Sequence, residues 1–225
     1  MKALIWKIIS LVLIGWSIIA GLIIKVPELP LIGESIRNIF FHVCMWFTMI
    51  FLLIYSFINS IKYLSTNKIK YDETASSSVD IALIFGILGV ITGMIWAKFT
   101  WGKFWLNDPK LNGAAISMLA YFAYKILRNS INNLTLKRKI SSIYNIFAFV
   151  ILLTFIFVLP KISETSIHPG KYNTPVLPTQ ISLNMKIILY PAILGWIILS
   201  YWLLNMILRF KNINSIYKKL NNERT

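Results

Sequence analysis

The chain has 225 residues, of which 57% are hydrophobic, and it carries 23 basic but only eight acidic residues. The mean hydropathy of +0.68 and the long apolar runs between the charges indicate a membrane protein, not a soluble globule. A formal net charge of +15 would suit a nucleic-acid binder, but such proteins gather their charge on folded basic surfaces, whereas here the charges punctuate apolar runs. We therefore expect no nucleic-acid partner.

Six apolar stretches are long enough to cross a bilayer as helices. A span needs about 20 mostly apolar residues, and a helix satisfies its own backbone amides where water is absent. The fourth stretch is the least hydrophobic. Lys2 and Lys7 begin the first, which lacks a small-x-small cleavage site before Lys25, so we expect that helix to be retained. The sequence predicts an all-α integral membrane protein with a single six-helix domain over residues 1–225. The expected spans are 3–24, 38–61, 79–96, 112–127, 141–160 and 186–208.

Six spans place both termini on one side of the membrane, and the distribution of Lys and Arg indicates which side that is. Fifteen of the 23 basic residues fall in segments on the side of the termini and eight on the other, so we expect both termini in the cytoplasm. Residues 66–78 then form a polar, solvated inner loop, and the basic tail from Arg209 lies beside anionic lipid headgroups. His42 falls at the outer end of the second span and His168 in the last outer segment. The expected outer segments are 25–37, 98–111 and 161–185.

Residues 96–108 follow the third span and hold five aromatic rings within ten residues. One interpretation is an interfacial belt, since tryptophan favours the headgroup level and lysines anchor helix ends there. The other is a platform for a flat hydrophobic ligand such as a porphyrin, because aromatic rings bury a large area and prefer stacked or edge contacts. Anionic groups of such a ligand would need cations. The outer basic candidates, which are otherwise ordinary membrane anchors, are Arg37, Lys98, Lys103 and Lys110.

The chain has two histidines, His42 and His168, and both map to the side of the aromatic loop. A lone histidine is more often an ordinary helix-end or loop residue, but neutral imidazole is also an axial ligand of haem iron. Met45 shares the helical face of His42 and is either a packing residue or an alternative ligand. Two outer histidines beside an aromatic platform favour a haem site.

Other short sequence features concern helix packing and helix ends, and none is an enzymatic motif. Gly89 and Gly93 form a G-x-x-x-G spacing, which lets helices approach closely, and Asp108 is placed to cap the fourth helix. Cys44 is the single cysteine, so no intramolecular disulfide can form, and we expect it to pack as a small apolar residue. The sequence contains no P-loop, H-E-x-x-H or C-x-x-C motif. We therefore expect a protein that is not an enzyme.

Residues 101–108, Trp-Gly-Lys-Phe-Trp-Leu-Asn-Asp, resemble the WWD motif W-G-x-W-W-x-W-D of the CcmC family of haem-handling proteins, which are related to the CcsA proteins. The first Trp, the Gly, the central Trp and the Asp of the motif are retained. Phe104 keeps an aromatic ring, whereas Asn107 replaces one. The resemblance extends to Phe-His-Val around His42 and to Ile-His-Pro-Gly at residues 167–170, and it covers nearly the whole chain.

This resemblance implies a membrane protein of cytochrome c biogenesis, similar to heme exporter protein C. Such a protein holds haem b non-covalently at the periplasmic face of the bacterial inner membrane and passes it to a membrane-anchored haem chaperone of the CcmE type. Its implied partners include an ABC transporter pair and a small single-span protein. The implied axial ligands are His42 and His168. The implied platform consists of Trp96, Trp101, Gly102, Phe104, Trp105 and Asp108.

Two alternatives to a haem carrier stay open on the sequence. A b-type electron-transfer subunit would hold haem within the bilayer between histidines on facing helices, but neither His42 nor His168 maps near mid-membrane. A haem-free scaffold or permease would use the aromatic loop only as an interfacial girdle. Loss or retention of haem binding on removal of the loop tryptophans separates this last alternative from a carrier.

Overall fold

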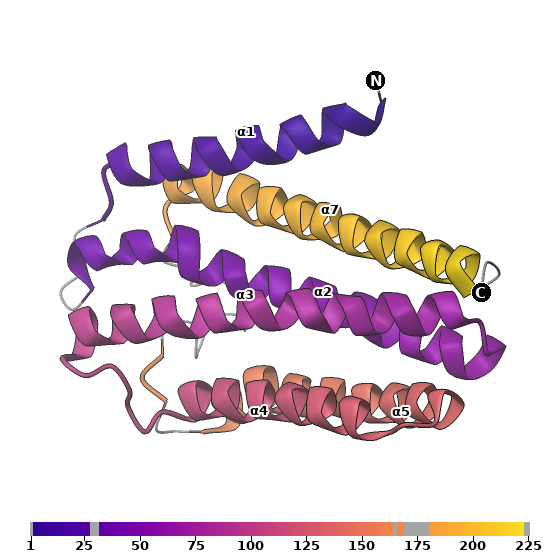
Figure 1. Ribbon diagram of the computed structural model, residues 1–225. Coiled ribbons are helices and arrows are strands. Elements are labelled where there is room, and N and C mark those ends of the chain that lie inside the picture. The colour runs from indigo at the N-terminus through magenta and orange to yellow at the C-terminus, as the bar shows by residue number, and fades with distance from the viewer. Residues whose placement is uncertain (1, 28–31, 164–165, 169–180, 223–225) are drawn as a thin grey trace.

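The computed structural model describes residues 2–27, 32–163, 166–168 and 181–222, and every regular element within these ranges is helical (Figure 1). The prediction of an all-α fold is therefore confirmed. The helices are α1 (Lys2–Ile23), η1 (Gly33–Asn38), α2 (Ile39–Thr66), α3 (Ile69–Trp101), α4 (Pro109–Ser130), α5 (Leu134–Leu153), η2 (Thr154–Val158), α6 (Leu159–Ile162) and α7 (Leu183–Asn222).

Five helical segments within the described ranges are long and apolar enough to cross a membrane. They confirm five of the six expected spans. The sixth, 112–127, forms helix α4, but its run contains more polar residues and falls below the apolarity of the others. The five candidate spans are Leu4–Ile23, Gly33–Thr66, Ile69–Trp101, Leu134–Ile162 and Leu183–Asn222.

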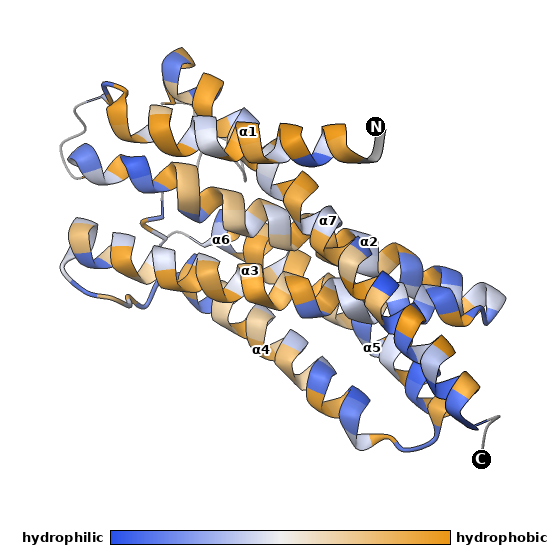
Figure 2. Cartoon of the chain, turned by 45° about the horizontal axis from the view of Figure 1, so that its top comes forward, coloured by the Kyte–Doolittle hydropathy of each residue, from blue (hydrophilic) through white to orange (hydrophobic). Residues whose placement is uncertain are grey.

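Helices α2 and α3 form an antiparallel pair at the centre of the bundle (Figure 1). Helix α7 packs on α2 and carries α1 on its far side, while the α4–α5 hairpin lies on the opposite side of the central pair. Both chain ends lie at the same end of the bundle (Figure 1). Large hydrophobic side chains are exposed along α1, α3 and α7. Hydrophilic residues gather at the C-terminal end of α7 (Figure 2). This distribution is that of helices surrounded by lipid.

The prediction of a solvated inner loop over residues 66–78 is wrong, because α3 begins at Ile69. Asp72 is 2% exposed, and its carboxylate accepts hydrogen bonds from both Arg128 amino groups at 2.8 and 2.7 Å, with Arg138 at 3.7 Å. Ser77 is fully buried and accepts a hydrogen bond from Lys211 of α7 at 2.7 Å. The polar residues that suggested a loop are thus interhelical partners, since a buried ionised group must be paired.

Candidate functional site

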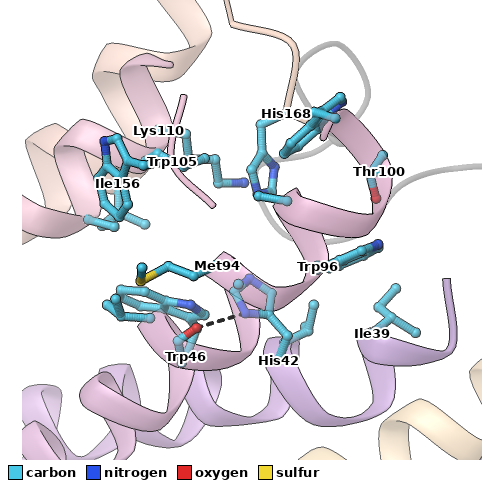
Figure 3. Close-up of a pocket in the computed structure, with 18 of the residues that line it drawn as sticks. Ile39, His42, Trp46, Met94, Trp96, Thr100, Trp105, Lys110, Ile156 and His168 are labelled. Carbon is cyan, nitrogen blue, oxygen red and sulfur yellow. Dashed lines mark hydrogen bonds between the residues drawn. The ribbon is translucent and has the colours of Figure 1, made fainter. Parts of the chain in front are cut away.

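A pocket opens at the end of the bundle away from the chain termini, between the start of α2, the end of α3 and the start of α4 (Figures 1 and 3). Its cavity volume is about 200 Å³. Its wall is mainly apolar and aromatic, and both histidines contribute to it. The lining residues are Ile32, Ile39, His42, Val43, Trp46, Phe47, Ile50, Gly89, Val90, Gly93, Met94, Trp96, Ala97, Thr100, Trp101, Phe104, Trp105, Lys110, Leu111, Ala114, Ile156, Phe157 and His168.

His42 is held in one orientation by the backbone of α3. Its Nδ1 lies 2.9 Å from the Gly89 carbonyl oxygen and 3.2 Å from the Thr92 hydroxyl oxygen. Because a carbonyl oxygen can only accept, we assign the imidazole proton to Nδ1. The Thr92 hydroxyl itself donates to the Leu88 carbonyl at 2.8 Å, which leaves its oxygen free to accept from His42. The lone pair of the ring is therefore on Nε2, the atom that remains for a metal ligand.

The two glycines of the G-x-x-x-G spacing make room for side chains of α2. A Cβ at Gly93 would stand 2.6 Å from Cε1 of His42, and a Cβ at Gly89 would stand 2.9 Å from Nε1 of Trp46. Both distances are far below ordinary contact, so a side chain at either position would displace the ring opposite. The spacing thus allows the close approach expected from the sequence, and it does so around two of the rings that line the pocket.

His42 lies between two tryptophans that meet it edge-on. The ring centroids of His42 and Trp96 are 5.8 Å apart at 77°, and those of His42 and Trp46 are 6.4 Å apart at 71°. The Trp96 indole donates a hydrogen bond to the Ser35 hydroxyl of η1 at 3.1 Å. Ser35 was missed by sequence reasoning, because nothing near it in the chain marks it as a partner of a tryptophan 61 residues away.

The aromatic segment is shorter as a loop than expected, because α3 continues to Trp101 and so includes Trp96. Gly102 ends the helix with φ +77°, a conformation that glycine adopts without strain, and its N–H donates to the Lys98 carbonyl at 3.0 Å. Gly102 therefore shapes the turn and does not line the pocket. Trp101 and Phe104, on either side of it, do line the pocket.

Asn107, which departs from the motif, holds the loop by hydrogen bonding. Its Oδ1 accepts from Nδ2 of Asn112 at 2.7 Å, and Oδ1 of Asn112 accepts from the indole of Trp105 at 3.1 Å. Asn107 is thereby linked to Trp105 by two hydrogen bonds through Asn112. Trp105 lines the pocket, so the position that lacks an aromatic ring helps to orient one that is present.

Asp108 is 2% exposed and lies where the loop meets α4. One carboxylate oxygen accepts from the N–H groups of Lys110 at 2.8 Å and Leu111 at 3.3 Å, which confirms the predicted helix cap. The other oxygen accepts from the Ile167 N–H at 2.8 Å. Ile167 directly precedes His168, so this carboxylate joins the aromatic loop to the segment of the second histidine.

His168 is half-buried, and its ring points into the pocket from the side opposite His42 (Figure 3). The two predicted axial ligands are therefore brought to one cavity, although they come from different parts of the fold. Pro169 and Gly170, the remainder of the motif-like run, lie outside the described residues.

Of the four basic candidates, Lys110 is the one among the described residues that lines the pocket, and its ammonium end points toward His168 (Figure 3). Burial lowers the pKa of Lys110, while the nearby Asp108 carboxylate opposes that shift. Arg37 pairs with Glu34 at 2.6 Å and donates to the carbonyl oxygens of Gly21 and Ile24 at the end of α1. Lys98 donates to the Gly102 carbonyl at 2.9 Å.

Lys103, the fourth basic candidate, is exposed and does not line the pocket.

The π-helical segment η2 contributes Ile156 and Phe157 to the pocket wall, and sequence reasoning missed both. Helix α4 comes so close to this segment that a Cβ at Gly113 would stand 2.4 Å from the Phe155 carbonyl oxygen. Wide helical turns of this kind are rare overall, but many of those that occur lie at functional sites.

Met45, the alternative ligand considered above, is buried in the core and does not line the pocket. Cys44 is fully buried, as expected of a packing residue.

Several apolar helices long enough to cross a membrane define a multi-pass membrane protein, and a pocket lined by histidine and tryptophan lies at one end of it. A family model described as cytochrome C assembly protein matches residues 3–167, and the chain belongs to this family. The match includes His42 and the whole aromatic loop and ends one residue before His168.

The chain is also similar to individual curated proteins. It is 26% identical over 128 residues to heme exporter protein C of Haemophilus influenzae, which covers 55% of this chain and 49% of that protein. It is 40% identical over 65 residues to cytochrome c biogenesis protein CcsA of Prochlorococcus marinus, covering 29% of this chain and 21% of the relative. The CcsA protein of Cuscuta reflexa matches at 32% over 78 residues, covering 34% and 25%. The chain thus spans half or less of the length of these relatives.

Proposed function

We propose that the pocket binds one haem b and that the protein serves cytochrome c assembly as a haem carrier. The observation that carries the proposal is that His42 and His168 line one cavity from opposite sides, among the tryptophans of the aromatic segment. The Nε2 of His42 and the imidazole of His168 would hold the haem iron. Bound haem would be the group that is delivered. The side chains of the pocket would bind it and orient it.

The residues present fit haem better than a bare metal ion. No group of three or more His, Cys, Asp or Glu side chains gathers anywhere in the described residues, so a bare ion lacks a ligand set. Haem iron brings four porphyrin nitrogens and needs only one or two protein ligands. The cavity has apolar walls from Phe47, Ile50 and Ala114, as a flat hydrophobic ring requires. The edges of Trp96 and Trp46 around His42 fit the same ligand.

Lys110 is the proposed partner of a haem propionate. It combines a charge inside the pocket with a place at the start of α4, where the helix dipole also favours an anion. Arg37 and Lys98 are engaged by carbonyl groups at helix ends, and we assign them to anchoring. Lys103, which is exposed, belongs with them.

We further propose that the pocket faces the periplasm and that both termini are cytoplasmic, in the bacterial inner membrane. Supporting this, the basic residues are concentrated on the side of the termini, and the termini lie at the end of the bundle away from the pocket. The place of both histidines at one end of the bundle argues against an electron-transfer site at mid-membrane.

The similarity to heme exporter protein C supports delivery of haem to a membrane-anchored chaperone of the CcmE type. Under this proposal the chain works beside ABC transporter subunits and a small single-span protein, and within membrane lipid. The pocket holds no nucleophile and base set for bond cleavage among its described lining residues, so we propose a carrier and not an enzyme.

The test is to add haem to the purified full-length protein in detergent and to record its absorption and electron paramagnetic resonance spectra. The wild type should give a six-coordinate low-spin spectrum, and His42→Ala and His168→Ala should each lose that signature. Trp101→Ala and Trp105→Ala should weaken haem binding, with Phe99→Ala as the control, because Phe99 is 78% exposed and does not line the pocket. Unchanged spectra in both histidine variants would refute the ligand assignment. Undiminished haem binding in both tryptophan variants would favour the alternative of a scaffold or permease whose aromatic segment only lies at the membrane interface.

A further inference from the structure

The two histidines of the pocket are held in place by different means. His42 is part of the long helix α2, and its ring is fixed by the Gly89 carbonyl at 2.9 Å. His168 lies outside any helix. The segment that carries it reaches the α4 side of the pocket through the Ile167 N–H, which donates to Asp108 at 2.8 Å. The side chain of Ile167 is 55% exposed, so packing of that side chain does not fix the segment.

We propose that Asp108 is a positioning residue that holds His168 in the pocket through the amide of Ile167. This inference rests on the proposed haem site and extends it. It assigns His42, on a helix, as the ligand that stays in place and His168, outside any helix, as the ligand that moves away when haem is released. A carrier must bind its ligand and also give it up. A site with one ligand on a rigid helix and the other on a segment held by a carboxylate can open without unfolding a helix.

The chemistry of Asp108 suits this task because the two carboxylate oxygens have separate partners. One oxygen caps α4 through the N–H groups of Lys110 and Leu111, and the other accepts from Ile167. The carboxylate is 2% exposed, so water does not compete with these donors. Hydrogen bonds to an ionised acceptor are shorter and stronger than neutral ones.

An asparagine at position 108 separates the two roles. Its carbonyl oxygen can still cap α4, since asparagine is as good a helix cap as aspartate. The side-chain NH₂ group of the asparagine then lies opposite the Ile167 N–H. Because both groups are donors, the hydrogen bond to the segment of His168 is lost. Asp108→Asn should therefore release His168 and leave the fold intact. Asp80→Asn is the matched control, because Asp80 pairs with Lys125 in the body of the bundle and not at the pocket.

A second pair of variants changes the donor and leaves Asp108 in place. Ile167→Pro removes the amide N–H, whereas Ile167→Ala shortens the side chain and retains the N–H. If the hydrogen bond positions His168, the proline variant should resemble Asp108→Asn. If the Ile167 side chain matters instead, the alanine variant should show the larger effect, and the proposal would be overturned.

The first measurement is hydrogen–deuterium exchange of the haem-free full-length protein, followed in the peptide that contains Ile167. Asp108→Asn should speed exchange of this amide by about tenfold or more, because a hydrogen bond to a charged group is lost, and Asp80→Asn should not. This measurement does not depend on haem. Equal exchange in the wild type and Asp108→Asn would overturn the proposal, even if haem binds.

The second measurement is the haem spectrum of the same variants. Asp108→Asn and Ile167→Pro should lose the six-coordinate signature, as His168→Ala does. A six-coordinate wild type with unchanged Asp108→Asn and Ile167→Pro spectra would refute the positioning role and leave the proposed haem site standing. A wild type without histidine ligation would refute the proposed function itself, so the two failures can be told apart.

Discussion

The ring of His42 lies directly against the backbone of Gly93, where a Cβ would stand 2.6 Å from Cε1 of the imidazole. No flexible side-chain end is available to yield at this point, because the histidine ring is also fastened to the Gly89 carbonyl. The residue opposite the proposed iron ligand is thus restricted to glycine by the position of the ring and not by a backbone turn.

We expect Gly93→Ala to push His42 off its hydrogen bond and to weaken haem binding by at least about tenfold, since about 1.4 kcal/mol corresponds to a factor of ten. Haem titration of the purified protein measures this. Gly15→Ala is the control, because Gly15 also lies in a membrane-crossing helix but a Cβ there meets nothing within 4 Å. Equal haem affinities of the two variants would contradict the assignment of His42.

Lys110→Ala should weaken binding of haem about tenfold and leave binding of the dimethyl ester of haem unchanged, because the ester lacks the carboxylates that the ammonium would pair with. Lys103→Ala is the matched control, since Lys103 is exposed and does not line the pocket. If Lys110→Ala weakened both ligands equally, its role would be packing and not charge recognition.

The preference for haem over its dimethyl ester should also depend on pH. Burial lowers the pKa of Lys110, so its ammonium group loses its proton at a lower pH than an exposed lysine does. The preference should be complete below that pKa and decline as the pH rises through it. Titration of the wild type with both ligands across the alkaline range measures this, and a preference that is constant up to the ordinary pKa of lysine would contradict it.

Ser35→Ala should remove the acceptor of the Trp96 indole, which lies 3.1 Å from the serine hydroxyl. Because Trp96 is only partly buried, loss of this hydrogen bond costs about 1 kcal/mol, and we expect looser packing of Trp96 beside His42 and a fall in haem affinity of about fivefold. Ser65→Ala, at an exposed position near the end of α2, is the control. Tryptophan fluorescence and haem titration report the two effects.

Arg128→Met should destabilise the protein by about 3 kcal/mol, because it leaves the buried Asp72 carboxylate with only the longer contact to Arg138. Lys139→Met removes an exposed charge on α5 and should change stability little. Thermal unfolding in detergent compares the two variants. Equal melting temperatures would show that the Asp72–Arg128 pair contributes no net stability.

Much of the fold could be predicted from the sequence, because the signals are local. The long apolar runs specify helices wherever they occur, since an unpaired backbone amide in lipid is so unfavourable. Asp108 before Pro109 marks a helix start through contacts within three residues, and the structure confirms that cap. Both histidines and the aromatic segment were expected on one side from span counting and charge, and the structure brings them to one pocket.

Tertiary structure decided the features that join distant parts of the chain. The first turns of α3 contain a buried aspartate and buried serines and suggested a solvated loop, but Asp72 has its partner Arg128 56 residues away. The same holds for Asp108 and Ile167, which are 59 residues apart. Hydropathy and periodicity report whether a residue suits water or lipid. They do not report which distant residue pairs with a buried carboxylate or with a backbone N–H outside a helix. Only the packing of the helices brings that residue into contact.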